Sequence, residues 1–421
     1  MNKLYFFVDY EWTKAISEIP GIFYERGLCE KNKNGQIRFK VTGIIDYQND
    51  TYVIYPKGMR VSDKSHQRKK NANLIYKVLH KYSRTNIIDD RENDWLGSND
   101  DIRMLELVQW FIEDYKQHGV IRIKRRVNQI NGGGRIEWSK TISRKLPIVN
   151  EDDLIYLDLI TSKNNFVNNE NLTLIHCLIL KEISERFGWL FDFKFDLPLE
   201  IPNYNTKYII YVLQKLLNVT YVEREIHLLK RMLIYWKRKT KTVGTEHLTI
   251  VATPFFHNVW ERMCADFMKD MSDLHTLVPN PYWMFENTKV LTKQIPDILI
   301  QFNGSLIVID AKYYRIKAGI DKLPGWGDIV KQLFYALSLK DKFPLIYNAF
   351  LFPTQYGSGI EYLGYSSVDE KEEMFGRIFA FGLDVQKVME FYIGAMSMDE
   401  SNDLRDALVN QLMKLNTELV S

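Results

Sequence analysis

Residues 295–315 read IPDILIQFNGSLIVIDAKYYR, and this stretch decides the fold of the C-terminal part of the chain. Two apolar runs, DILIQF and SLIVID, flank Asn303-Gly304, a dipeptide that is the strongest short signal for a β-hairpin. Asp297 lies six residues before Asn303, and Asp310 lies six residues after Gly304. Antiparallel pairing about this turn predicts that the two carboxylates are neighbours at one end of the hairpin.

Two carboxylates in this position repel each other, which favours protonation of one of them unless a cation lies between them. Oxygen ligands without a nearby His or Cys cluster suit Mg²⁺ better than zinc, and Mn²⁺ is the expected substitute. We expect Asp297, Asp310 and the backbone carbonyl of Ala311 to bind the ion. Lys312 points to the same face as Asp310 by the strand period of two, so it can position a metal-bound water as the ammonium or deprotonate it as the free amine.

A structural alternative is a buried hairpin with a salt-bridged Asp-Lys edge, because short Asp-x-Lys triplets are frequent by chance. The complete arrangement favours the functional interpretation. Pro-Asp, an Asn-Gly hairpin of apolar strands and a terminal Asp-Ala-Lys occur together here.

Pro296-Asp297 followed by Asp310-Ala311-Lys312 resembles the PD-(D/E)xK signature of many restriction enzymes. The resemblance implies an α/β restriction-endonuclease-like domain that cuts DNA with a divalent metal. In that fold a helix before the hairpin often supplies another acid. TPFFHNVWERMCADFM, residues 253–268, has the right position and amphipathic spacing, which makes Glu261 a candidate metal ligand and catalytic residue. An ordinary exposed helical glutamate is the alternative.

GWGDIVKQLFYALSL, residues 325–339, is predicted to be a helix with Asp328 as its N-cap. Its Gln332 and Tyr335 resemble the Gln-Tyr helix motif of a subset of these nucleases, although the usual spacing is one residue wider. Gln332 is therefore a candidate catalytic residue, and Tyr335 a weaker one. Packing roles are the alternative for both.

VWERM, PDILI, IVIDAKYYR and PGWGDIVKQLFYAL together resemble the LlaJI-type restriction endonucleases and, more remotely, the McrC nuclease subunits, mainly within residues 253–352. The resemblance implies cleavage of double-stranded foreign DNA together with a separate McrB-like AAA+ GTPase. The sequence has no GxxxxGK[ST] phosphate loop, so we expect this chain to bind no nucleotide itself. A repair or recombination nuclease for branched or single-stranded DNA, and an inactive DNA-binding or assembly adaptor, are the competing hypotheses.

A length of 421 residues predicts two or three domains. We expect a β-rich N-terminal region at 1–150 that docks a partner or DNA, a mainly helical middle region at 151–245, and the nuclease domain at 246–421. IRFKVTGII and TYVIYPKGM read as an N-terminal hairpin, and VIRIKRRV and RIEWSKTI read as a strand pair around Gly132-Gly133-Gly134.

The formal net charge of +3, from 56 basic and 53 acidic residues, gives no strong argument for a polyanionic partner. Two basic clusters are candidate DNA contacts through phosphates, and solvated surfaces are the alternative. Their members are Arg68, Lys69, Lys70, Lys237, Arg238 and Lys239. Three scattered cysteines and the lack of a secretory or membrane-spanning segment predict a cytoplasmic protein. Cutting both strands predicts a dimer or larger assembly.

Overall fold

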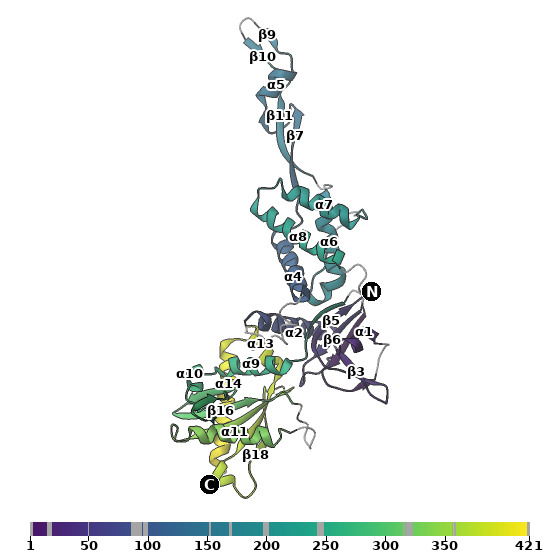
Figure 1. Cartoon of the computed structure of the whole chain (residues 1–421). Helices are drawn as coiled ribbons and strands as arrows, with labels where there is room; N and C mark the ends of the chain where they lie inside the picture. Colours follow the sequence, from purple (N-terminus) through teal and green to yellow (C-terminus); the bar gives the residue numbers. More distant parts are fainter. Residues whose placement is uncertain are drawn as a thin grey trace. The chain divides into compact units, whose positions relative to one another are not determined.

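The structure is a computed structural model that describes residues 3–14, 19–48, 50–85, 95, 100–150, 153–167, 171–196, 202–241, 248–314, 316, 323–355, 357 and 359–418. Contacts divide the chain into two compact units (Figure 1): unit 1 comprises residues 1–102 and 247–421, and unit 2 comprises residues 103–246. The expected mixed α/β chain with a β-rich N-terminal region is confirmed. The docking and cutting roles of the three expected regions stay predictions. No described helix is long and apolar enough to cross a membrane.

The N-terminal part of unit 1 contains two small sheets and a short helix. Its elements are β1 (Lys3–Val8), β2 (Thr13–Lys14), α1 (Gly21–Glu25), β3 (Cys29–Lys31), β4 (Gln36–Phe39), β5 (Thr42–Tyr47), β6 (Asp50–Tyr55) and β12 (Leu248–Thr253). One sheet has the order β1-β6-β5-β12 and the other β2-β4-β3. The predicted hairpin is confirmed, because β5 and β6 pair antiparallel with Tyr47 opposite Asp50.

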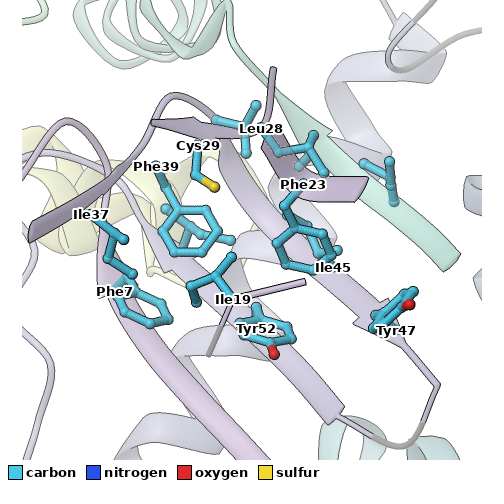
Figure 2. Packing of buried hydrophobic residues seen from close by; sticks show 14 residues of the cluster. Phe7, Ile19, Phe23, Leu28, Cys29, Ile37, Phe39, Ile45, Tyr47 and Tyr52 are labelled. Carbon is cyan, nitrogen blue, oxygen red and sulfur yellow. The ribbon is translucent and has the colours of Figure 1, made fainter. Parts of the chain in front are cut away.

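An aromatic core lies between these two sheets. Figure 2 shows Phe7, Phe23, Phe39 and Tyr52 gathered there, with the Phe23 and Tyr52 rings 4.9 Å apart and the Phe7 and Phe39 rings 4.6 Å apart. Burial of each such side chain stabilises the fold by roughly 2 to 3 kcal/mol. Gly43 lets β12 approach β5, because a Cβ at this residue would lie 2.2 Å from the Val251 carbonyl oxygen.

The C-terminal part of unit 1 is a five-stranded sheet covered by helices. The elements of this part, with α2 from the N-terminal half, are α2 (Ser65–Thr85), α9 (Phe256–Met268), α10 (Ser272–His275), β13 (Tyr282–Phe285), β14 (Thr288–Leu291), β15 (Ile298–Phe302), β16 (Ser305–Ala311), α11 (Trp326–Leu339), β17 (Ile346–Thr354), β18 (Ile360–Ser366), α12 (Glu372–Phe375), β19 (Ile378–Asp384), α13 (Val385–Tyr392) and α14 (Met398–Glu418). The sheet order is β15-β16-β17-β19-β18. Strands β16, β17 and β19 are parallel, and the two edge strands are antiparallel to their neighbours.

The hairpin predicted around Asn303-Gly304 is formed by β15 and β16. Ile298 pairs with Ile309, and both turn residues have positive φ, 49° for Asn303 and 80° for Gly304, as a type I′ turn requires. Even-numbered residues of β16 face α11, since Val308 packs in one cluster with Tyr335. Successive residues point to opposite faces of a sheet, so odd-numbered residues face away from α11.

Unit 2 combines a helical part with a strand-rich part. Its elements, with the first three residues of α4 counted in unit 1, are α4 (Asp100–His118), β7 (Ile123–Ile130), β8 (Arg135–Ile136), α5 (Trp138–Arg144), β9 (Ile148–Asn150), β10 (Asp153–Ile155), β11 (Ile160–Val167), α6 (Asn171–Phe191), α7 (Thr206–Leu217) and α8 (Glu223–Lys241). The helices α6, α7 and α8 lie within the range expected to be helical.

The predicted pairing of VIRIKRRV with RIEWSKTI is wrong. Strand β11 lies between β7 and β8 in the three-stranded sheet, and the segment becomes helical at Trp138. Contacts with β11, which is distant in the sequence, determine this arrangement. A Cβ at Gly134 would lie 2.4 Å from the Ser162 carbonyl oxygen of β11, so only glycine allows this close approach. The Thr141 hydroxyl accepts the Ile160 backbone N–H at 3.0 Å.

Candidate active site

The β15-β16 hairpin brings Asp297 and Asp310 together. Asp297 directly precedes β15, and its Oδ2 atom accepts the backbone N–H of Ala311 at 2.9 Å. Asp310 lies within β16 and is 2% exposed. Burial, then the charges of Asp310 and Glu261, raise the pKa of Asp297 to about 8. Near neutral pH the pair therefore holds a proton unless a cation replaces it.

The donor set of this pair fits a hard divalent cation. The buried Oδ1 atom of Asp310 has no donor among the described residues other than a proton shared with Asp297. In the part of the chain that the structure describes, no group of three or more His, Cys, Asp or Glu side chains could hold a metal ion. Two carboxylates are nevertheless enough for Mg²⁺, which keeps several water ligands and binds through one or two carboxylates plus phosphate oxygens.

Lys312 lies between two carboxylates. Its Nζ atom is 2.5 Å from Asp310 Oδ2 and 3.0 Å from Asp328 Oδ1. Burial lowers the pKa of Lys312, but the two carboxylates outweigh it and raise the pKa above the ordinary value for lysine. Lys312 is therefore an ammonium ion in this arrangement, which suits it to orient an oxygen or stabilise negative charge rather than accept a proton.

The helix α11 contributes Asp328 in a role that the sequence did not reveal. The prediction that Asp328 is the N-cap is wrong, because Gly325 occupies that position and Asp328 lies in the first turn. A carboxylate in the first turn is stabilised by the unpaired N–H groups and dipole of the helix. The same carboxylate binds Lys312, so α11 holds the lysine against the strand.

Helix α11 also carries Gln332, Lys331 and Tyr335. Gln332 is 1% exposed, and its Nε2 donates to the Val308 carbonyl of β16 at 2.9 Å, so its amide contacts the strand backbone. Its catalytic role stays a prediction. Lys331, which sequence reasoning missed, is largely exposed; its partial burial lowers its pKa, but Tyr335, then Asp310 and Asp297, raise the pKa above the ordinary value for lysine. Tyr335 is fully buried in the core beneath the sheet.

Glu261 lies on α9 and is half-buried. Its charge helps to raise the pKa of Asp297 and, after burial and Asp297, that of the Cys264 thiol, so it is electrostatically close to the carboxylate pair. The fold brings all three acids of the sequence prediction into one neighbourhood. Metal binding by Glu261 stays a prediction.

The two basic clusters lie at the ends of helices. Arg68, Lys69 and Lys70 are in the first turns of α2 in unit 1, where Arg68 donates to the Ser62 and Asp63 carbonyls. Lys237, Arg238 and Lys239 end α8 in unit 2, where Lys239 lies 2.6 Å from Glu182. Their contact with DNA stays a prediction.

Comparisons with known proteins find related sequences over most of the chain. A family model described as LlaJI restriction endonuclease matches residues 41–393. The "Type II restriction enzyme BsuMI component YdjA" of Bacillus subtilis (strain 168) is 26% identical, covering 94% of this chain and 88% of that protein.

Two solved assemblies from Thermococcus gammatolerans also match. A half-complex of McrB AAA+ hexamers with bound McrC gives a TM-score of 0.38 at 12% identity, covering 97% of this chain and 100% of the matched chain. The McrBC complex gives a TM-score of 0.24 at 11% identity, covering 56% of this chain and 80% of the matched chain.

Proposed function

The chain belongs to the LlaJI restriction endonuclease family, and we propose that it is the DNA-cleaving subunit of a restriction system, hydrolysing phosphodiester bonds of double-stranded DNA. One observation carries the proposal: Asp297 and Asp310 adjoin, with buried Asp310 bonded to the half-buried ammonium of Lys312. We assign the five-stranded sheet of β15 to β19 to the PD-(D/E)xK fold. The support is that the hairpin with the two carboxylates follows α9 and precedes α11 in the chain.

In the proposed mechanism, Asp297, Asp310 and the Ala311 carbonyl would hold Mg²⁺, or Mn²⁺ in its place. The bound ion would supply a water of lowered pKa and polarise the phosphate. Lys312 orients the attacking oxygen and stabilises the charge that develops on the phosphate. Because Lys312 is itself protonated, the proton of the attacking water leaves to solvent or to a phosphate oxygen. Glu261 and Gln332 are proposed as supporting residues.

We further propose that this subunit works with a separate AAA+ GTPase motor. The absence of a phosphate loop from the sequence supports this, since the chain has no nucleotide-binding motif of its own. The name of the Bacillus subtilis relative describes it as a component of its enzyme, in agreement with a multi-subunit system. GTP-dependent cleavage that requires the product of an adjacent gene is the expected result.

The cleavage test compares the unmodified full-length chain with Asp310→Asn, each combined with the products of the adjacent genes, Mg²⁺ and linear double-stranded DNA. We expect Asp310→Asn to lose at least 100-fold in rate. Asp341→Asn, a change of the same kind at an exposed residue, is the matched control. Cleavage by Asp310→Asn at the control rate would falsify the assignment.

The same assay separates the competing functions. Cleavage confined to branched or single-stranded DNA would place this site in repair or recombination. A chain that binds neither Mg²⁺ nor Mn²⁺ in calorimetry and cuts no DNA would be an adaptor. The intact carboxylate pair argues against the adaptor, because buried like charges are costly to keep without a cation.

A further inference from the structure

The residue that follows Lys312 is held by the N-terminal sheet of unit 1. The Tyr313 hydroxyl donates a hydrogen bond to Asp9 Oδ2 at 2.7 Å and accepts one from the Lys57 backbone N–H at 2.8 Å. The Tyr313 carbonyl accepts a hydrogen bond from Lys57 Nζ at 3.0 Å. Both the side chain and the backbone of Tyr313 are therefore bonded to residues more than 250 positions away.

Tyr313 and Lys312 point to opposite faces of the strand end. Lys312 faces α11, where it binds Asp328. Tyr313 is buried on the other face, where its ring lies 5.4 Å from that of Phe256 in α9. This alternation follows from the strand period of two. Contacts on both faces thus fix the backbone that carries Lys312.

The N-terminal side of this contact is itself rigidly placed. Asp9 is buried, its N–H donates to the Tyr55 carbonyl at 2.9 Å, and its Oδ2 atom also accepts the Thr42 hydroxyl at 2.8 Å. Strands β1, β5 and β6 therefore all contribute to holding this carboxylate.

A second contact joins the same two sheets. Gly58, just beyond β6, has a φ of +84°, and a Cβ at this residue would lie 2.7 Å from the Pro353 carbonyl in β17. Strand β17 also provides the Leu351 carbonyl that accepts the Lys312 backbone N–H at 2.8 Å. The turn after β6 thus reaches the strand that pairs with Lys312.

We propose that Asp9, Lys57 and Tyr313 are positioning residues that fix Lys312 relative to Asp310 during cleavage. This inference rests on the proposed function. Lys312 lies just beyond the last residue of β16, so its place depends on the residue after it as well as on the strand before it. A misplacement of about 1 Å in a catalytic group costs on the order of 100-fold in rate.

On this proposal, the C-terminal part of the chain alone is an incomplete nuclease. A fragment spanning residues 246–421 retains Asp297, Asp310 and Lys312 but lacks Asp9, Thr42 and Lys57. On this proposal the N-terminal sheet is a working part of the catalytic module, in addition to any docking role.

The test uses Tyr313→Phe in the full-length chain, because this change removes the hydroxyl and retains the ring that packs on Phe256. We expect the single-turnover cleavage rate to fall at least 10-fold, with Mn²⁺ affinity and DNA affinity close to those of the unmodified chain. The thermal unfolding midpoint is expected to fall by only a few degrees, which leaves the chain folded in the assay. Tyr347→Phe, at a buried tyrosine of β17, is the matched control and keeps the full rate.

Further variants distinguish positioning from general stability. Lys57→Met is expected to lower the rate as Tyr313→Phe does, and Lys57→Arg, which keeps a donor, is expected to restore most of it. Asp9→Asn combined with Tyr313→Phe is expected to be no slower than the slower single variant, because both break one connection.

The outcomes separate this inference from the proposed function. If Asp310→Asn abolishes cleavage while Tyr313→Phe and Lys57→Met cut at the control rate, the positioning role is wrong and the nuclease assignment stands. A rate loss that merely follows a loss of folded protein or of DNA affinity also overturns the positioning role. Cleavage that survives Asp310→Asn overturns the proposed function itself.

Discussion

The Lys312 ammonium lies 2.5 Å from the Asp310 carboxylate, and the two side chains are only 14% and 3% exposed. A buried pair of this kind contributes little net stability, but removal of one partner leaves an uncompensated charge. The Lys312 ammonium also neutralises part of the negative charge of Asp297 and Asp310. The consequences of removing Lys312 therefore differ for metal binding and for cleavage.

We predict that Lys312→Met lowers the cleavage rate by about 100-fold or more, the scale expected for loss of a group that stabilises developing charge. Affinity for Mn²⁺ is expected to be equal or higher, because the carboxylates lose a competing cation. Rate measurements and calorimetry on the same preparation check both outcomes. Lys340→Met, at an exposed lysine just after α11, is the control. A parallel loss of metal affinity and rate would contradict the role given to Lys312.

Divalent metal is predicted to stabilise the folded chain. Burial and the neighbouring charges raise the pKa of Asp297 to about 8, so near neutral pH the folded pair holds a proton that a bound cation replaces, and this cation site exists only in the folded state. At a metal concentration of about 100 times Kd, binding to the folded state alone adds roughly 2.7 kcal/mol. Thermal unfolding with Mg²⁺, with Mn²⁺ and with a chelator measures the effect. The stabilisation by metal should be much smaller in Asp310→Asn. If Mg²⁺ or Mn²⁺ stabilised this variant as much as the unmodified chain, the ion would bind elsewhere.

Asp328→Asn is predicted to lower the cleavage rate about 10-fold, a smaller effect than that of Lys312→Met. The substitution removes one of the two carboxylates that hold Lys312 and also a favourable charge in the first turn of α11, worth about 0.3 to 1 kcal/mol of stability. The rate loss is expected in kcat rather than KM, because Asp328 acts through Lys312. Asp341→Asn serves again as the control. A change confined to KM would instead indicate a direct contact of Asp328 with DNA.

Local sequence signals predicted the hairpin geometry at the centre of the candidate site. The Asn303-Gly304 turn and two short apolar strands fix the hairpin register without help from distant residues, and the strand period adds Lys312 to the face of Asp310. The five-stranded sheet could be expected only in outline, since its parallel neighbours come from segments separated by helices.

Long-range contacts could not be predicted in the same way. Asp328 has the sequence pattern of an N-cap, and its ion pair with Lys312 depends on how α11 lies on the sheet. Tyr313 and Asp9 are 304 residues apart, so no local pattern connects them. Strand β12 likewise pairs with β5 after the whole of unit 2 intervenes.

Acid is predicted to destabilise unit 2 through His176. This imidazole is completely buried in α6, where its Nδ1 atom accepts the Ile121 backbone N–H at 3.2 Å. Burial lowers the pKa of His176 from 6.5 to about 4, with the charges of Asp114 and Arg224 acting in opposite directions as smaller influences. The unfolded chain therefore binds a proton at a higher pH than the folded chain does.

Protonation of His176 therefore favours the unfolded chain, and acid lowers the stability of the folded one. His176 does not affect stability above pH 6.5, and stability falls as the pH drops from 6.5 toward 4, with a loss approaching about 3 kcal/mol at pH 4. Urea unfolding of the full chain at pH 7, 6, 5 and 4.5 measures it. His176→Gln keeps a neutral acceptor and should flatten the pH dependence across this range, whereas His227→Gln, at an exposed histidine of α8, should leave it unchanged. Equal slopes for His176→Gln and the unmodified chain would mean that other groups cause the loss at low pH.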